Sequence, residues 1–220
     1  MRVNESGRSM IEMLGVLAII GVLSVGGIAG YSKAMNKFKT NKIADNVSMI
    51  VTNIRTLYAQ QNDYVGLNNK TAIQMGVIPD ELGTDATSGT LTNAFQGTVL
   101  IDAAQSGNSG APNKAFVLTM NGLSREACVS LATNDWGSGY SAGLIGLRVT
   151  GAAATNDAAV TGTTNLQVNC NGSGTGSPTY ACAGAAASGT NVPTPLNVAK
   201  AATACACGTA NVCSITWKFY

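Results

Sequence analysis

The 220 residues of this chain suffice for one compact domain and an anchoring segment. Only 11% of the residues are charged and 26 are glycine, a composition that favours a loop-rich domain with β-strands over a tightly packed helical one. The formal net charge of +2 implies no strongly charged partner for the whole chain, and the absence of histidine removes the commonest general base and transition-metal ligand.

An uncharged apolar stretch extends from Met13 to Tyr31, directly after Glu12. At a helical rise of about 1.5 Å per residue it spans roughly 28 Å, close to the thickness of one hydrocarbon core. A cleaved secretory signal is the alternative, but no small-x-small cleavage site follows the apolar stretch. We therefore expect a membrane-spanning helix, and a carboxylate at its edge is costly enough to predict a specific task for Glu12.

The helical pattern continues beyond the apolar stretch, and no proline interrupts residues 8–62. Apolar side chains recur there at steps of three and four, which places them on one helix face; they are Phe38, Ile43, Val47, Ile50, Val51, Ile54, Leu57 and Tyr58. We predict one continuous helix of about 50 residues, with residues 8–32 in lipid and the amphipathic residues 33–62 outside it. A helix of this length requires partners along it, in a bundle or in an assembly.

Four lysines follow the apolar stretch within ten residues, with no acid among them: Lys33, Lys37, Lys39 and Lys42. They are interpreted as a solvated helix face, with anionic lipid headgroups or acidic neighbours as the alternatives. Counting lysines alone would place this side of the helix in the cytoplasm. The cysteines of the second half favour an exported C-terminal domain instead.

Residues 63–220 are predicted to form this exported domain. Thr71 caps a short helix that Gly76 and Pro79 end, and residues 80–94 form a loop. Further strands and helices are predicted from alternation, helical spacing and capping residues. The strands are 98–102, 115–120, 144–150, 165–169 and 214–219, and the helices are 124–131 and 195–204.

All six cysteines lie in the second half of the chain: Cys128, Cys170, Cys182, Cys205, Cys207 and Cys213. Their even number behind a membrane-directing segment predicts disulfides, for which 15 pairings exist. We expect a local bridge between Cys170 and Cys182, and Cys128 bonded to the C-terminal cluster so that it ties the middle helix to the last strand. Cys205 or Cys207 would share the remaining bridges with Cys213 or Cys128. A cysteine-only metal site is the alternative, but paired C-x2-C knuckles are missing, so we predict no metal and no cofactor.

The segment Gly7-Arg8-Ser9-Met10-Ile11-Glu12, followed by the apolar helix, resembles the start of a type IV prepilin. The resemblance implies a leader peptide of residues 1–7, cleavage between Gly7 and Arg8, and N-methylation of Arg8. Glu12 then stands at the fifth mature position, where it pairs with the amino terminus of a neighbouring subunit during assembly. The chain departs from the family in having Arg8 where an apolar residue is usual, and Ala29 where many relatives have proline.

Three later segments resemble type IVb pilins: residues 71–79, residues 116–131 with Cys128, and the final strand from Cys213 to Tyr220. The resemblance implies an α+β pilin fold. In it, a long N-terminal α-helix, membrane-spanning in its first half and amphipathic in its second, packs on an antiparallel β-sheet. Residues 63–220 would be the globular head domain, with a disulfide-bonded region at 128–213.

The expected function is therefore that of a major pilin and not of an enzyme, because the acidic residues show no catalytic pairing. The precursor would sit in the inner membrane, be cut by prepilin peptidase, and be stacked by the pilus assembly machinery into a helical homopolymer. This extracellular filament would serve adhesion, aggregation, motility or DNA uptake, with a host-cell or surface receptor as a further partner. The alternatives are a pseudopilin of type II secretion, a minor pilin or tip adhesin, and a membrane-anchored enzyme.

Overall fold

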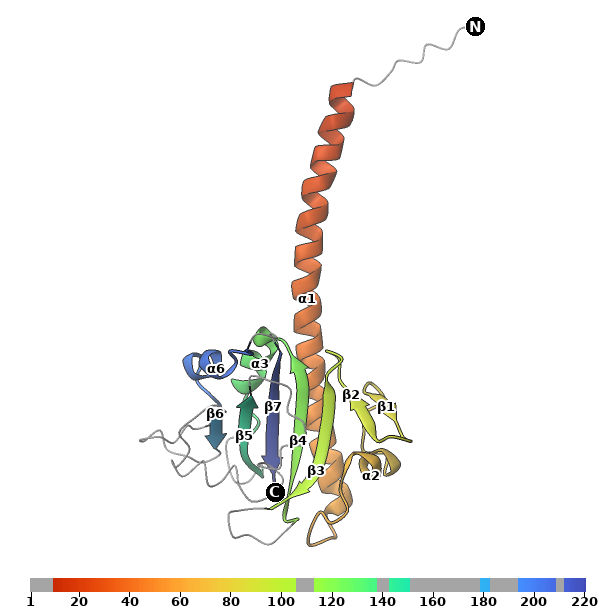
Figure 1. The fold of residues 1–220 in the computed structure, drawn as a ribbon, viewed down its shortest axis with the longest axis vertical. Coiled ribbons are helices and arrows are strands. Elements are labelled where there is room, and N and C mark those ends of the chain that lie inside the picture. The colour runs from red at the N-terminus through yellow and green to blue at the C-terminus, as the bar shows by residue number, and fades with distance from the viewer. Residues whose placement is uncertain (1–9, 106–112, 138–142, 151–178, 183–193, 209–211) are drawn as a thin grey trace. The chain divides into compact units, whose positions relative to one another are not determined.

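The structure is a computed structural model that describes residues 10–105, 113–137, 143–150, 179–182, 194–208 and 212–220. By its internal contacts the chain divides into two units, residues 1–38 and residues 39–220. The first helix, α1 (Met10–Tyr58), contributes to both units. Its 49 residues confirm the predicted long helix (Figure 1).

The part of α1 that belongs to residues 39–220 buries one face. Its buried side chains recur mainly at steps of three and four; they are Thr40, Ile43, Asn46, Val47, Ile50, Val51, Ile54 and Tyr58. Phe38 and Leu57, which were predicted on this face, are exposed instead, because they lie at its edges. The apolar residues among the buried ones share one hydrophobic core with the strands and helices that follow. The predicted amphipathic helix packed on a sheet is thus confirmed.

Within the described residues, seven antiparallel strands form one sheet in the order β1-β2-β3-β4-β7-β5-β6 (Figure 1). Their bounds are β1 Gly83–Asp85, β2 Thr90–Thr92, β3 Thr98–Ala104, β4 Ala115–Leu123, β5 Leu144–Thr150, β6 Thr179–Cys182 and β7 Cys213–Phe219. The last strand in the sequence therefore lies near the middle of the sheet, between β4 and β5.

The strand register aligns apolar side chains on the face that α1 covers. Ile101, Leu118, Trp217 and Leu147 are successive cross-strand partners on β3, β4, β7 and β5, and each is at least 99% buried. Since partners directly opposite each other point to the same side of a sheet, they form one row of the core. Trp136 packs its ring edge-on against Trp217, with the ring centroids 5.0 Å apart.

Two helices stand beside the sheet, and both begin at a capping side chain. Helix α3 (Arg125–Ala132) starts after Ser124, whose hydroxyl accepts a hydrogen bond from the Ala127 amide. Helix α6 (Val198–Ala204) starts after Asn197, whose side chain accepts from the Lys200 amide. Both confirm predicted helices, the second with a later start.

The structure differs from the sequence prediction between residues 68 and 94. Helix α2 (Asn69–Gln74) is capped by Asn68 and not by Thr71, because the Asn68 carboxamide accepts the Thr71 amide and so begins the helix three residues earlier. The predicted loop at 80–94 contains strands β1 and β2, each three residues long. Strand β6 was also not predicted, while the predicted strand at 165–169 lies outside the described residues.

Candidate assembly helix and the closure of the C-terminal strand

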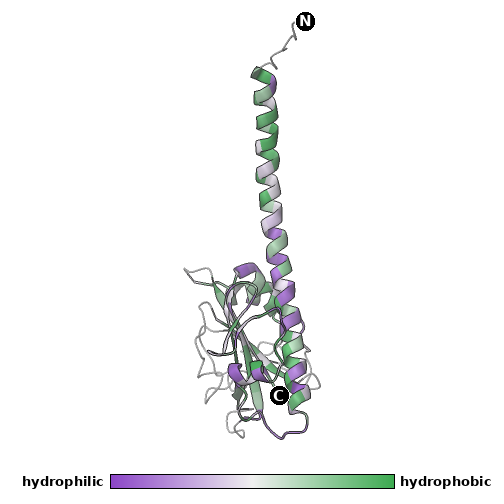
Figure 2. Cartoon of the chain, turned by 90° about the vertical axis from the view of Figure 1, so that its right-hand side faces the viewer, coloured by the Kyte–Doolittle hydropathy of each residue, from purple (hydrophilic) through white to green (hydrophobic). Residues whose placement is uncertain are grey.

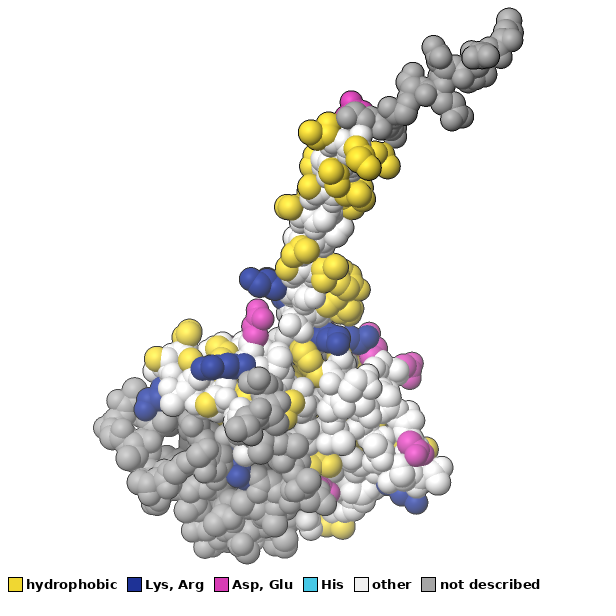
Figure 3. Space-filling model, turned by 45° about the horizontal axis from the view of Figure 1, so that its top comes forward, with side chains coloured by type: hydrophobic (Ala, Val, Ile, Leu, Met, Phe, Trp, Pro, Cys, Tyr) yellow, Lys and Arg dark blue, Asp and Glu magenta, His cyan; other side chains and the backbone are white. Residues whose placement is uncertain are grey.

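The first half of α1 exposes an apolar surface. From Met10 to Tyr31 every large apolar side chain is exposed, and none of the most apolar 18-residue window is buried. By length and composition this helix can cross a membrane. Figure 2 colours most of this half of the helix as hydrophobic, and the space-filling view in Figure 3 shows hydrophobic side chains on its surface. Such a surface requires lipid or other protein to cover it.

Glu12 lies in the first turn of α1, where its side chain is exposed at the edge of this apolar surface. A carboxylate there interacts favourably with the amino-terminal end of the helix dipole. Gly7 and Arg8, the predicted cleavage pair, lie outside the described residues.

Two disulfides are present in the described part of the C-terminal region. Cys128 of α3 is bonded to Cys205, which follows α6, and Cys207 is bonded to Cys213, which begins β7. The predicted bond from Cys128 to the C-terminal cluster is confirmed, with Cys205 as its partner, and Cys207–Cys213 is one of the pairings left open. The predicted direct tie from the middle helix to the last strand is wrong: Cys128 holds the end of α6, and Cys207 holds the strand. The Cys170–Cys182 bridge concerns side chains outside the described ones.

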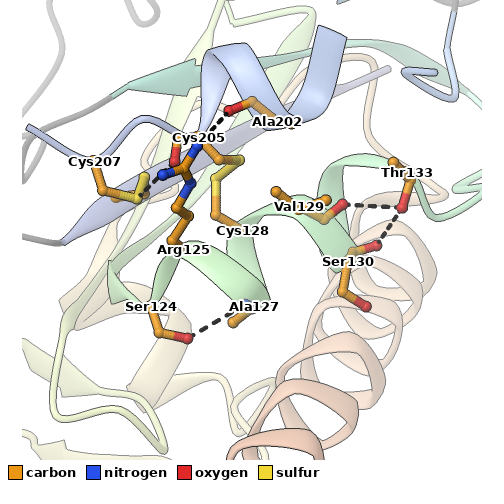
Figure 4. Close-up of a disulfide and its surroundings, with 11 residues drawn as sticks. Ser124, Arg125, Ala127, Cys128, Val129, Ser130, Thr133, Ala202, Cys205 and Cys207 are labelled. Atoms are coloured by element: carbon orange, nitrogen blue, oxygen red, sulfur yellow. Dashed lines mark hydrogen bonds between the residues drawn. A yellow bond between two sulfur atoms is a disulfide. The ribbon is translucent and has the colours of Figure 1, made fainter. Parts of the chain in front are cut away.

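The two bridges are adjacent and buried. The sulfur atoms of Cys128, Cys205 and Cys213 lie within 4.8 Å of one another, and all of these side chains are fully buried. Figure 4 shows the first bridge between α3 and α6, where Arg125 also donates to the Ala202 carbonyl oxygen at 3.4 Å. Because these sulfurs are bonded in pairs, they are not thiolates that could hold a metal ion.

The other end of β7 is fixed by a contact that the sequence did not reveal. The Arg55 guanidinium of α1 donates from Nε and Nη2 to the main-chain oxygen of Tyr220, at 3.0 Å in each case. The Tyr220 amide donates to the Gly143 carbonyl oxygen at 2.7 Å. The guanidinium carbon also lies 5.7 Å from the centre of the Phe219 ring. We call the group Arg55, Gly143, Phe219 and Tyr220 the C-terminal clamp.

Gly143 is required for this clamp to close. Its φ of +69° favours glycine, and a Cβ atom built there would lie 1.4 Å from Arg55 Nη2. Beside the clamp, the Tyr64 ring lies between the rings of Tyr58 and Phe116, with centroids 5.2 and 4.9 Å away. Burial raises the pKa of the Tyr64 hydroxyl, and the nearby Arg55 opposes that rise.

Lys218 is a second feature that the sequence did not reveal. It lies on β7 opposite Val117 and Gly146, on the face of the sheet away from Trp217, and its side chain is fully buried. Desolvation lowers the pKa of its ammonium from 10.5 to about 8. A buried lysine in a central strand destabilises the fold unless surrounding groups compensate.

A long N-terminal helix packed on an antiparallel sheet, with a disulfide-bonded C-terminal region, is the architecture of a pilin. The family model described as PilS N terminal matches residues 37–181. The chain belongs to the type IV pilin family. Proteins of this family are structural subunits and not enzymes, in agreement with the prediction.

Similar proteins include two curated pilus subunits. The chain is 32% identical over 147 residues to the major structural subunit of bundle-forming pilus of Escherichia coli O127:H6, covering 64% of this chain and 72% of that protein. It is 27% identical over 136 residues to the toxin coregulated pilin of Vibrio cholerae serotype O1, covering 60% and 59%. The solved structure of TcpA, a type IV pilin from Vibrio cholerae El Tor, is similar with a TM-score of 0.50 and 18% identity. That match covers 83% of this chain and 99% of the other, and supports the fold alone.

Proposed function

We propose that this chain is the major structural subunit of a type IV pilus, anchored in the inner membrane as a precursor and polymerised through residues 8–32. The observation that carries the proposal is the fully exposed apolar half of α1, attached to a folded domain that uses the other half of the same helix as its core. Lipid covers this surface in the precursor, and the apolar helices of neighbouring subunits cover it in the filament.

The division of the chain follows from this proposal. Residues 1–7 are the leader, residues 8–32 the filament-core helix, residues 33–62 the amphipathic half, and residues 63–220 the head domain. Prepilin peptidase cuts between Gly7 and Arg8, and Arg8 is then N-methylated. Peptide mass mapping and N-terminal sequencing of the native product test both steps, and an intact bond before Arg8 would refute them.

Glu12 sets the register of the subunits in this proposal. In an apolar filament core, the free-energy cost of an unpaired carboxylate exceeds the free energy that a charge pair gains. Arrangements that leave Glu12 unpaired are therefore disfavoured, and the arrangement with Glu12 beside a neighbour's amino terminus is selected. The major subunit of bundle-forming pilus, which this chain resembles, supports a filament-forming role.

The experiment compares Glu12→Ala and Glu12→Gln with the wild-type protein in cells that lack the native subunit. We expect membrane insertion and leader cleavage at wild-type levels, but loss of filaments in both variants. Filaments are counted by electron microscopy of sheared surface material, and precursor and product by immunoblots of membrane fractions. Normal filaments from Glu12→Ala would refute the register mechanism, and assembly confined to the periplasm would indicate a secretion pseudopilin instead.

A further inference from the structure

The four lysines after the apolar stretch differ in their surroundings. No acid occurs between Glu12 and Asp45 in the sequence, so none of the lysines has an acidic neighbour within one helical turn on the amino-terminal side. Lys39 lies with Nζ 5.6 Å from the centre of the Phe95 ring, and Lys42 Nζ lies 3.4 Å from Glu81 Oε2. Both contacts are internal to residues 39–220.

Lys33 and Lys37 belong to the unit of residues 1–38, and both side chains are exposed. Residues four apart lie on the same side of an α-helix, with their side chains about one turn apart. The two ammonium groups can therefore approach one anion together.

Their distance from the apolar stretch places them at the depth of the lipid headgroups. At about 1.5 Å per residue, Lys33 lies about 3 Å and Lys37 about 9 Å beyond Tyr31 along the helix axis. The headgroup layer is roughly 5–8 Å thick on each side of the hydrocarbon core. Helical side chains lean toward the amino terminus, so both lysines extend back toward the membrane. Tyr31, exposed at the end of the stretch, suits the same interface.

We propose that Lys33 and Lys37 of the membrane-anchored precursor bind the phosphate of an anionic phospholipid in the leaflet next to the head domain. The inference rests on the proposed function, because it requires α1 to span a bilayer before assembly. A lipid such as phosphatidylglycerol fits better than a zwitterionic one, whose own ammonium group compensates its phosphate. An acidic surface on a second copy of the chain is the competing partner. The lipid is favoured because the pair directly follows the apolar stretch and lies at headgroup depth.

The test uses the full chain reconstituted in phosphatidylcholine bilayers that contain traces of spin-labelled phosphatidylglycerol or spin-labelled phosphatidylcholine. Electron paramagnetic resonance measures the share of each labelled lipid that the protein immobilises, and hence their relative association constants. A near-surface attraction of about fivefold for each lysine gives the pair a phosphatidylglycerol preference of up to about 25-fold at low salt. We expect Lys33→Gln/Lys37→Gln to reduce it to near unity. The matched variant Lys39→Gln/Lys42→Gln, which removes the same charge, should retain it.

The outcomes separate this proposal from the proposed function. Immobilised lipid without a phosphatidylglycerol preference would overturn the lipid site and leave the membrane anchor intact. No immobilised lipid of either kind would overturn the anchor itself. An equal loss of phosphatidylglycerol preference in the matched variant would show that the preference depends only on the total positive charge. That outcome would refute a specific site at Lys33 and Lys37. Unchanged lipid preference in Lys33→Gln/Lys37→Gln, together with fewer filaments, would assign the pair to a contact between subunits.

Discussion

Removing the Cys128–Cys205 bridge should destabilise the protein more than removing the Cys207–Cys213 bridge. The first joins residues 77 apart in the sequence and the second residues 6 apart. In the chain-entropy model, a longer closed loop restricts the unfolded chain more, which gives about 4.5 kcal/mol for the first bridge and about 2.2 kcal/mol for the second. The double variants Cys128→Ala/Cys205→Ala and Cys207→Ala/Cys213→Ala should therefore differ by about 2 kcal/mol.

The comparison isolates loop length because the two bridges have the same environment. All four cysteine side chains are fully buried, so each alanine pair loses a similar packing contribution. The remaining bridge in each variant stays closed under oxidising conditions. Urea denaturation of the detergent-solubilised full chain, followed by the fluorescence of the Trp136 and Trp217 pair, measures the free energy of unfolding. An equal or larger loss in the short-loop variant would refute the reasoning.

Three further predictions concern the clamp and the sheet. Arg55→Ala should lower the free energy of unfolding by about 1–2 kcal/mol, because it removes two charge-assisted hydrogen bonds to Tyr220 at a partly exposed site; Arg55→Lys, the control, should lose less, and urea curves that overlay wild type for Arg55→Ala would contradict the clamp. Gly143→Ala should be at least as damaging as Arg55→Ala in the same assay, because it combines a strained φ with a clash, and a neutral outcome would show that Arg55 does not occupy that space. Lys218→Met should raise the free energy of unfolding at pH 7 by at most about 3 kcal/mol, since desolvation lowers the folded pKa to about 8, below the unfolded value of 10.5. In wild type the unfolded state binds more protons between these pH values, so stability should rise from pH 8 toward 10.5; denaturation at several pH values checks this, and a Lys218→Met variant that keeps the same rise would exclude Lys218 as its source.

Local signals in the sequence predicted most of the fold. Continuous helical spacing without proline was enough for α1, because no stop signal competes with it. Ser124 marked the start of α3 through the capping hydrogen bond that the structure contains. Strands β3, β4, β5 and β7 were found because each is seven or more residues of mostly apolar, β-prone sequence.

The misses have physical causes. Strands β1 and β2 are three residues long and consist mainly of glycine, threonine and aspartate, which are typical of turns. For α2, both Asn68 and Thr71 are capping residue types, and only the backbone geometry decides between them. Lys218 alternates with Trp217 and Phe219, so the period of two predicts that it faces solvent. It is buried because the second face of the sheet is covered as well.

The site could be predicted only in part, because its contacts join distant residues. Arg55 and Tyr220 are 165 residues apart, and no local pattern links a helix arginine to the main chain after a final strand. The choice among cysteine pairings likewise depends on how α3, α6 and β7 meet. Cleavage at Gly7, methylation of Arg8 and pairing of Glu12 remain predictions from the family motif, which a single subunit does not test.

The placement of β7 connects these contacts to the proposed filament. This strand pairs with both β4 and β5 and so joins the two parts of the sheet. Its start is then fixed by Cys213 and its end by the C-terminal clamp.

The clamp ties this strand to α1, and α1 is the element through which a filament would be pulled. If load reaches the head domain along α1, Arg55 transfers part of it to the central strand of the sheet. Loss of the clamp should therefore weaken filaments under shear more than it lowers subunit stability at rest. For Arg55→Ala, filament length after graded shearing measures the strength of the filament, and urea curves measure the stability of the subunit. Proportional losses in the two assays would contradict a role of the clamp in transmitting force.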